Sequence, residues 1–141
     1  AQFECIPKDT GSGVSSIAGN ELPYSSPFTF TLAYSHYFGL QSGASIEPYV
    51  KFHFKDETHF TEGNFDAIAS LSDKRDAYGT VDFTVKYVSP NETWSVEAFV
   101  YNATDERFQT YYVGGPSPDA PLFTWNAPRS AGIRAAYNLK P

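Results

Sequence analysis

Hydrophobic and polar residues alternate with a period of two along five segments of the chain. The segments span about residues 28–35, 44–55, 78–88, 94–101 and 129–139. In the second segment one face carries Ile46, Val50, Phe52 and Phe54, and the other carries Glu47, Tyr49, Lys51, His53 and Lys55. Successive side chains of a β-strand point to opposite faces of its sheet. The pattern therefore predicts five β-strands, each with an apolar and a polar face.

The connections between these segments alternate in length. Short turns, at residues 39–43 and 89–92, follow the first and third segments, whereas long polar connections follow the second and fourth. This alternation is typical of an up-and-down outer-membrane β-barrel. A soluble meander that packs its apolar face on a core fits the same periodicity. We therefore predict an all-β fold: an antiparallel up-and-down meander of about five strands, part of or derived from an outer-membrane β-barrel.

Composition supports β structure and narrows the function. Aromatic residues make up 17% of the 141 residues, and they fit the pleated surface of a sheet. The net charge of −6 argues against nucleic acid as a partner, because phosphate binding needs a basic face. The lone Cys5 leaves no internal disulfide. No apolar run approaches the roughly 20 residues of a membrane-spanning helix, but a transmembrane strand needs only about 9–11 residues.

The start of the chain differs from the rest. Residues 1–23 are rich in Gly, Ser and Asn without a sustained period, which predicts a flexible loop or leader before a β-barrel segment at residues 24–141. No signal peptide pattern is visible at Ala1. Aromatic residues near the predicted strand ends suit the two interfacial girdles of a membrane barrel. These residues are Tyr24, Phe28, Phe38, Trp94 and Tyr137.

Four motifs occur in a consistent order along residues 22–139. WSVEAFVYNATDERF at residues 94–108 closely resembles the penultimate-strand signature of TonB-dependent outer-membrane receptors, although Ala103 replaces the usual Leu. APRSAGIR at residues 127–134 resembles the opening of the final strand in that family. LPYSSP at residues 22–27 and DAYGTVD at residues 76–82 resemble entries to earlier strands. The resemblance implies the last five strands of such a receptor.

The resemblance also implies how the 94–108 motif folds. Asn102 to Asp105 would be a polar notch, with a β-bulge, inside one long strand that resumes through Arg107, Phe108 and Thr110 toward an external loop. A bulge re-aims side chains without ending the pairing of a strand. We therefore expect a single strand on both sides of the notch.

The family implies a 22-stranded barrel with a plugged lumen. Its members take up scarce nutrients of the siderophore, cobalamin or glycan type, so the resemblance implies location in the bacterial outer membrane, contact with its lipid, coupling to TonB and a small-molecule ligand. The chain shows no plug domain and no energy-coupling box, and it ends Asn138-Leu139-Lys140-Pro141 where the family tends to end on an aromatic residue. We expect either a fragment of a receptor or a truncated relative.

A truncated relative would need to protect its edges, because open strand edges are not tolerated in lipid. A homodimer, a small closed barrel or capping by residues 1–23 would do so. This alternative is a stand-alone small β-barrel whose apolar faces form a pocket that binds or hydrolyses a small amphipathic ester or lactone. It would be a hydrolase, with or without a metal. The chain has no Gly-x-Ser-x-Gly motif and no spacing that selects a catalytic triad, so no catalytic residue is assigned and an enzyme is not favoured.

Two groups of residues are candidate metal ligands, so a divalent metal is the one cofactor left open. His53, Lys55, Glu57 and His59 share a strand face, with successive members about 6–7 Å apart. Zinc accepts two His and a carboxylate, so His53, Glu57 and His59 are candidate zinc ligands. The loop carboxylates Glu62 and Asp66 are candidate calcium ligands, without the regular spacing of a calcium loop. The alternative interpretation of the first group is a row of lumen-facing polar residues, and that of the second is an ordinary solvated acidic loop.

Four aromatic residues flank a loop rich in Gly and Pro. They are Tyr111, Tyr112, Phe123 and Trp125. Aromatic rings stack on flat or sugar-like molecules, so we predict that these residues form ligand-contact loops. Packing within the loop or in a membrane girdle is the alternative interpretation.

Overall fold

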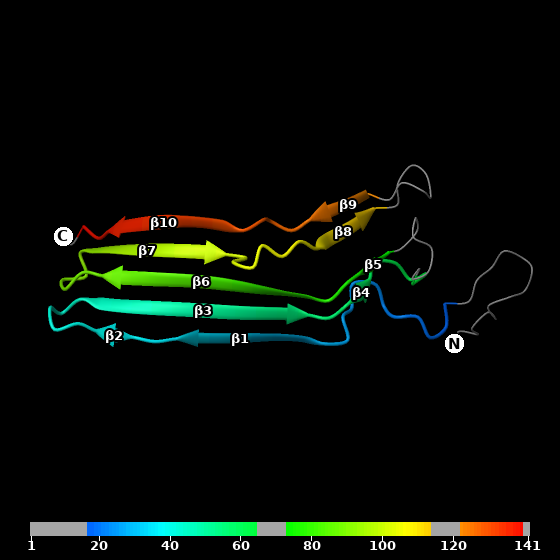
Figure 1. Cartoon of the computed structure of the whole chain (residues 1–141), viewed down its shortest axis with the longest axis horizontal. Coiled ribbons are helices and arrows are strands. Elements are labelled where there is room, and N and C mark those ends of the chain that lie inside the picture. The colour runs from blue at the N-terminus through cyan, green and yellow to red at the C-terminus, as the bar shows by residue number, and fades with distance from the viewer. Residues whose placement is uncertain (1–16, 65–72, 114–121, 140–141) are drawn as a thin grey trace, which may run out of the picture. The chain divides into compact units, whose positions relative to one another are not determined.

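The computed structural model describes residues 17–64, 73–113 and 122–139. In these ranges the regular structure consists of β-strands arranged in three sheets (Figure 1). The strands are β1 (Thr29–Ser35), β2 (Phe38–Gly39), β3 (Ser45–Lys55), β4 (Thr58–His59), β5 (Lys74–Arg75), β6 (Tyr78–Val88), β7 (Trp94–Tyr101), β8 (Gln109–Val113), β9 (Leu122–Trp125) and β10 (Ser130–Tyr137). None of the described residues belongs to a helix long and apolar enough to cross a membrane.

The chain divides into two compact units. The sheet unit comprises the described residues of 28–55, 78–108 and 126–139. The loop unit comprises those of 17–27, 56–64, 73–77, 109–113 and 122–125. The predicted boundary at residue 23 is a different division of the chain, and it stays a prediction. The five long strands lie in the sheet unit, and the long connections between them supply the loop unit.

The sheet unit is an antiparallel meander with the strand order β1-β3-β6-β7-β10, to which β2 adds by pairing with β3. One row of directly opposite residues crosses all five strands: Tyr34, Val50, Phe83, Val100 and Ala131. Tight turns join β2 to β3 and β6 to β7, whereas the stretches from β3 to β6 and from β7 to β10 are long. The predicted all-β meander is therefore confirmed, and the five segments with a period of two agree with β1, β3, β6, β7 and β10 to within two residues.

The register divides the sheet into an apolar and a polar face. The row beside Tyr34–Ala131 contains Tyr49, Thr84, Phe99 and Gly132, and a further polar row contains Glu47, Lys86, Glu97 and Arg134. Every charged residue of the five strands lies on this polar face, because all of them occupy the same alternate positions. The opposite face carries no charged side chain in any of the five strands.

The apolar face is open to its surroundings. Leu32 is 66% exposed and Ile133 is 75% exposed, and within the described residues Ala44 and Phe60 are the buried hydrophobic side chains. Along β3 this face extends from Ile46 to Phe54, about 26 Å at a rise of about 3.3 Å per residue. An outer-membrane barrel presents an outward apolar band about 25 Å tall. The face therefore has the height and the composition of such a band.

Pro48 explains why β1 and β2 are separate strands. The N–H of His36 donates to the Pro48 carbonyl (3.1 Å), and an antiparallel pair would return a bond from residue 48 to residue 36. Proline has no N–H to donate. The ladder is broken at this pair and resumes at Phe38, opposite Ile46. On the other side of β3, Pro48 stays paired with Val85.

The expected single strand through residues 102–108 is wrong. β7 ends at Tyr101, and the next strand, β8, pairs with β9 in a separate two-stranded sheet. Asn102 (φ 50°) and Asp105 (φ 56°) adopt left-handed backbone conformations, which a strand does not contain. The interruption is therefore a folded turn and not a one-residue bulge.

The side chain of Asn102 holds this turn together. Its Oδ1 accepts the Glu106 N–H (3.0 Å), and its Nδ2 donates to the carbonyls of Glu106 (2.9 Å) and Ala127 (3.3 Å). The Asn102 N–H donates to Asp82 Oδ1 on β6 (3.0 Å). The buried Asn102 amide thus closes its own turn and reaches Ala127, 25 residues away, while its N–H bonds to β6, so the end of β7 is fixed to β6 and to the segment before β10.

Candidate functional site

The loop unit is built on a two-stranded ribbon, β4 paired with β5. The N–H of Tyr24 donates to the His59 carbonyl (2.8 Å), which joins the segment before β1 to the ribbon. The N–H of Phe60 donates to the Asp73 carbonyl (2.9 Å). Three stretches of chain far apart in sequence are thus joined through their backbones.

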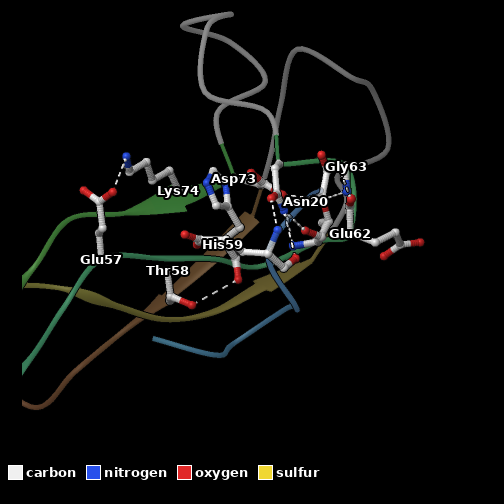
Figure 2. Close-up of polar contacts among 11 residues, drawn as sticks. Asn20, Glu57, Thr58, His59, Glu62, Gly63, Asp73 and Lys74 are labelled. Carbon is white, nitrogen blue, oxygen red and sulfur yellow. Dashed lines mark hydrogen bonds and ion pairs between the residues drawn. The ribbon is translucent and has the colours of Figure 1, made fainter. Parts of the chain in front are cut away.

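A buried carboxylate organises the ribbon. Asp73 is fully buried (0% exposed), and one of its oxygens lies 3.1 Å from Nδ1 of the buried His59 (Figure 2). The other oxygen accepts the Thr61 backbone N–H (3.0 Å) and also the Thr61 hydroxyl. Burying a charged group is costly unless it is hydrogen-bonded and paired. These contacts therefore account for a charge in the interior of the loop unit.

Two asparagines tie the segment before β1 to the turn after β4. Nδ2 of Asn20 donates to the Glu62 carbonyl (2.7 Å; Figure 2). The Asn64 amide bonds the Glu21 backbone twice, since its Oδ1 accepts the Glu21 N–H and its Nδ2 donates to the Glu21 carbonyl (3.2 Å). These bonds hold residues 20–21 against the turn after β4.

Aromatic rings pack around Phe60, which is 4% exposed. Its ring centroid lies 5.3 Å from Tyr24, 6.1 Å from Tyr112 and 6.3 Å from Phe123. Tyr112 and Phe123 are opposite each other on β8 and β9, with centroids 5.4 Å apart. Tyr24 also stacks on Tyr111 at 6.1 Å.

The structure therefore brings together three of the four predicted ligand-contact residues, Tyr111, Tyr112 and Phe123. The fourth, Trp125, lies opposite Gln109 at the other end of the β8–β9 ribbon, with its side chain half exposed. Tyr24 was expected in a membrane girdle, but its ring packs within the loop unit. Sequence reasoning missed Phe60 because a single aromatic residue in a polar connection has no periodic neighbours.

The candidate metal ligands have other contacts. Nδ1 of His53, on the polar face of the sheet unit, lies 2.9 Å from the Thr31 hydroxyl. Glu57 forms an ion pair with Lys74 (2.9 Å; Figure 2), and His59 contacts Asp73. Throughout the described ranges, no three His, Cys, Asp or Glu residues are grouped so as to hold a metal ion. The zinc site stays a prediction. So does the calcium site, since Asp66 lies outside the described residues.

Charged side chains on the polar face of the sheet unit pair across neighbouring strands. Lys51 and Asp82 are 2.6 Å apart, and Arg134 and Glu97 are 2.7 Å apart. The Arg134 guanidinium also lies over the Phe99 ring, 4.4 Å from its centroid, and donates to the Tyr101 hydroxyl (3.2 Å). These contacts leave a face that is polar and close to neutral.

Comparison with known proteins supports the fold. The sequence matches no protein-family model and no curated protein. The structure matches part of the ferric yersiniabactin uptake receptor FyuA from Yersinia pestis, with a TM-score of 0.72 over 84% of this chain and 18% sequence identity. The sheet has the fold of part of a TonB-dependent receptor barrel. The motif resemblance is confirmed at the level of the fold, and the chain spans 17% of the length of FyuA.

Proposed function

We propose that this chain forms part of the wall and the outer loops of a bacterial outer-membrane receptor that takes up a scarce nutrient. The nutrient is of the siderophore, cobalamin or glycan type, and uptake is driven through TonB. The observation that carries the proposal is the division of the sheet into an open face without charge and a face that holds every charged residue of the strands. A barrel wall between lipid and a polar interior needs this division.

The loop unit supports a role in ligand selection. Tyr111 is 53% exposed and Trp125 is 51% exposed, so their rings are available to a flat or sugar-like molecule. Phe60 and Asp73 are buried beneath the surface of the same unit and hold its backbone in place. The uptake of ferric yersiniabactin by FyuA supports an iron chelate as one class of ligand.

The two tryptophans of the chain provide a direct test of the wall. Trp94 begins β7 on the apolar face of the sheet unit, whereas Trp125 ends β9 in the loop unit. Replacing one tryptophan at a time, by Trp125→Phe or Trp94→Phe, leaves a single reporter in each variant. After refolding into vesicles that contain brominated lipid, we expect strong quenching of Trp94 fluorescence and weak quenching of Trp125.

Equal quenching of the two reporters would count against the wall. The wall role would also be contradicted if the chain stayed monomeric and folded in buffer, with Trp94 already shielded from water. That second result would favour the stand-alone β-barrel, and a screen with small ester and lactone substrates would then be the next measurement. Binding of ferric chelates to the refolded chain, compared with Tyr111→Ala, tests the loops separately.

A further inference from the structure

His36 is a polar side chain on the apolar face of the sheet unit. It lies between β1 and β2, opposite Pro48, and its side chain is exposed. Its ring packs between two aromatic residues of that face, with centroids 4.3 Å from Phe38 and 6.3 Å from Tyr34. These contacts place an imidazole, which can carry a positive charge, among apolar side chains.

One ring nitrogen of His36 has a partner and the other is available. Nδ1 lies 3.4 Å from the Tyr34 hydroxyl, which is a long hydrogen bond. Nε2 has no hydrogen-bond partner among the described residues. Both nitrogens of a protonated imidazole are donors. The charged ring therefore presents a free N–H to whatever lies against the apolar face.

The described part of the sheet unit supplies no counter-ion for this ring. The titratable side chains on the same face at this end of the sheet are the phenols of Tyr34 and Tyr87. The carboxylates at this end, Glu47 and Glu92, line a cavity of about 300 Å³ on the polar face. A charge in apolar surroundings is costly unless it is paired. The anion that pairs with a charged His36 therefore comes from outside the sheet unit.

Two features place His36 near the rim of the apolar face. Aromatic side chains occupy that face at the tight-turn end of the sheet: Phe38, Tyr87, Trp94 and Tyr137. His36 is two residues, about 7 Å, from Phe38. The carbonyl of His36 also receives no bond from Pro48, which has no N–H. Because an unbonded carbonyl is costly in hydrocarbon but not beside water, both features indicate the level of lipid headgroups.

We propose that His36 binds the phosphate of an anionic phospholipid whose acyl chains lie along the apolar face. The proposal rests on the wall role. Nε2 of the charged ring donates to a phosphate oxygen, and hydrogen bonds between two charged groups are the strong ones. Tight turns of outer-membrane barrels face the periplasm, so the lipid belongs to the inner leaflet. Binding strengthens as the pH falls through the range in which histidine gains its charge.

Native mass spectrometry of the full chain in maltoside micelles tests the proposal, with dioleoyl phosphatidylglycerol as the probe. Maltoside supplies apolar chains without phosphate, and each bound lipid adds a known mass. We expect the dissociation constant of the wild type to be about tenfold lower at about pH 5.5 than at about pH 8. His36→Phe keeps an aromatic ring without nitrogens. It should bind about tenfold more weakly at about pH 5.5 and show little dependence on pH.

Two further variants separate phosphate binding from packing. His36→Lys keeps a positive charge at both pH values, so it should bind the lipid tightly at both. Tyr37→Phe removes a hydroxyl from the next residue, which lines the cavity of the polar face, and it should bind as the wild type does. Unchanged circular dichroism spectra of all three variants would show that the sheet is folded.

Two results would overturn the proposal. One is equal affinity of the wild type and His36→Phe for phosphatidylglycerol at about pH 5.5. The other is displacement of the lipid by an equal concentration of inorganic phosphate, which would indicate a site for free phosphate. Because the assay needs no vesicle, it can fail separately from the wall. Strong quenching of Trp94 with equal affinities contradicts the lipid site alone, and weak quenching with intact lipid binding contradicts the wall alone.

Discussion

Gly132 shows how a missing side chain shapes the polar face of the sheet. A Cβ at this position would lie 2.7 Å from Cζ of Phe99, the residue opposite it on β7. The same ring supports the guanidinium of Arg134. Because the ring would have to move away from its cation, we expect Gly132→Ala to destabilise the sheet by about 1–3 kcal/mol. Denaturant unfolding in detergent measures the change.

The control for Gly132→Ala is the same substitution in a variant that lacks the Phe99 ring. The three atoms nearest to the added Cβ all belong to the Phe99 ring, so a Phe99→Ala background removes them. Replacing glycine in a strand also lowers the entropy of the unfolded chain. Gly132→Ala should then be neutral or stabilising by up to about 1 kcal/mol. An equal loss in both backgrounds would show that the backbone of β10, and not Phe99, requires the glycine.

Asn102 provides a second test, because it combines an unusual backbone angle with buried amide contacts. Asn102→Gly keeps the left-handed conformation easily but removes the bonds to Glu106 and Ala127. Asn102→Ala removes the same two bonds and also disfavours the left-handed conformation. We expect the alanine variant to cost about 2–3 kcal/mol and the glycine variant to cost less. Faster amide exchange at Glu106 in both variants is the accompanying signature. If the two variants lose equal stability, the backbone angle has no separate contribution.

Sequence reasoning identified the Asn102 motif but not what the residue does. The motif was identified by its amino-acid sequence alone. A sequence match does not reveal that the backbone of Asn102 is left-handed. The bond to Ala127 joins residues 25 positions apart, which no local pattern encodes. The buried pair of His59 and Asp73 is hidden for the same reason. Both residues looked like members of a polar connection, whereas their contacts depend on the pairing of β4 with β5.

Two variants of the β4–β5 ribbon show whether a buried or an exposed charged residue stabilises the loop unit more. Asp73→Asn keeps the shape of a fully buried side chain but weakens its contacts with Thr61 and His59. Glu57→Gln removes an ion pair with Lys74 at a half-exposed position. We expect a loss of about 2–4 kcal/mol for Asp73→Asn and at most about 1 kcal/mol for Glu57→Gln. Amide exchange at Phe60 and Thr61 reports the opening of the ribbon. Similar losses in the two variants would mean that Asp73 is not what fixes the ribbon.

The long strands could be predicted and the short ones could not. β3 and β6 are eleven residues each, so their period-two pattern is sampled many times, and most of their apolar positions face the same way. β4 and β5 have two residues each, too few for any period. β8 was predicted as an extension of β7. Its pairing with β9 includes a register shift between Gln109 and Tyr111, and it depends on a turn whose geometry is not visible in composition.

The strongest test of the whole molecule compares neighbouring positions on opposite faces. Phe83 lies on the apolar face in the middle of β6, and Thr84 follows it on the polar face. A lysine on the lipid face near the bilayer midplane costs about 2–4 kcal/mol, whereas interior positions accept charge. We therefore expect Phe83→Lys to reduce insertion into vesicles strongly and Thr84→Lys to leave it nearly unchanged.

The same two variants separate lipid from a protein core as the cover of the apolar face. In buffer Phe83 is already partly exposed, so a lysine there loses little burial within the chain itself. Under the wall interpretation, Phe83→Lys should harm insertion but raise the solubility of the chain. Under the stand-alone interpretation, an inward-turned face would bury that lysine and destabilise the chain without any lipid. Chemical unfolding in buffer and flotation with vesicles, measured on both variants, assign the apolar face to one of these environments.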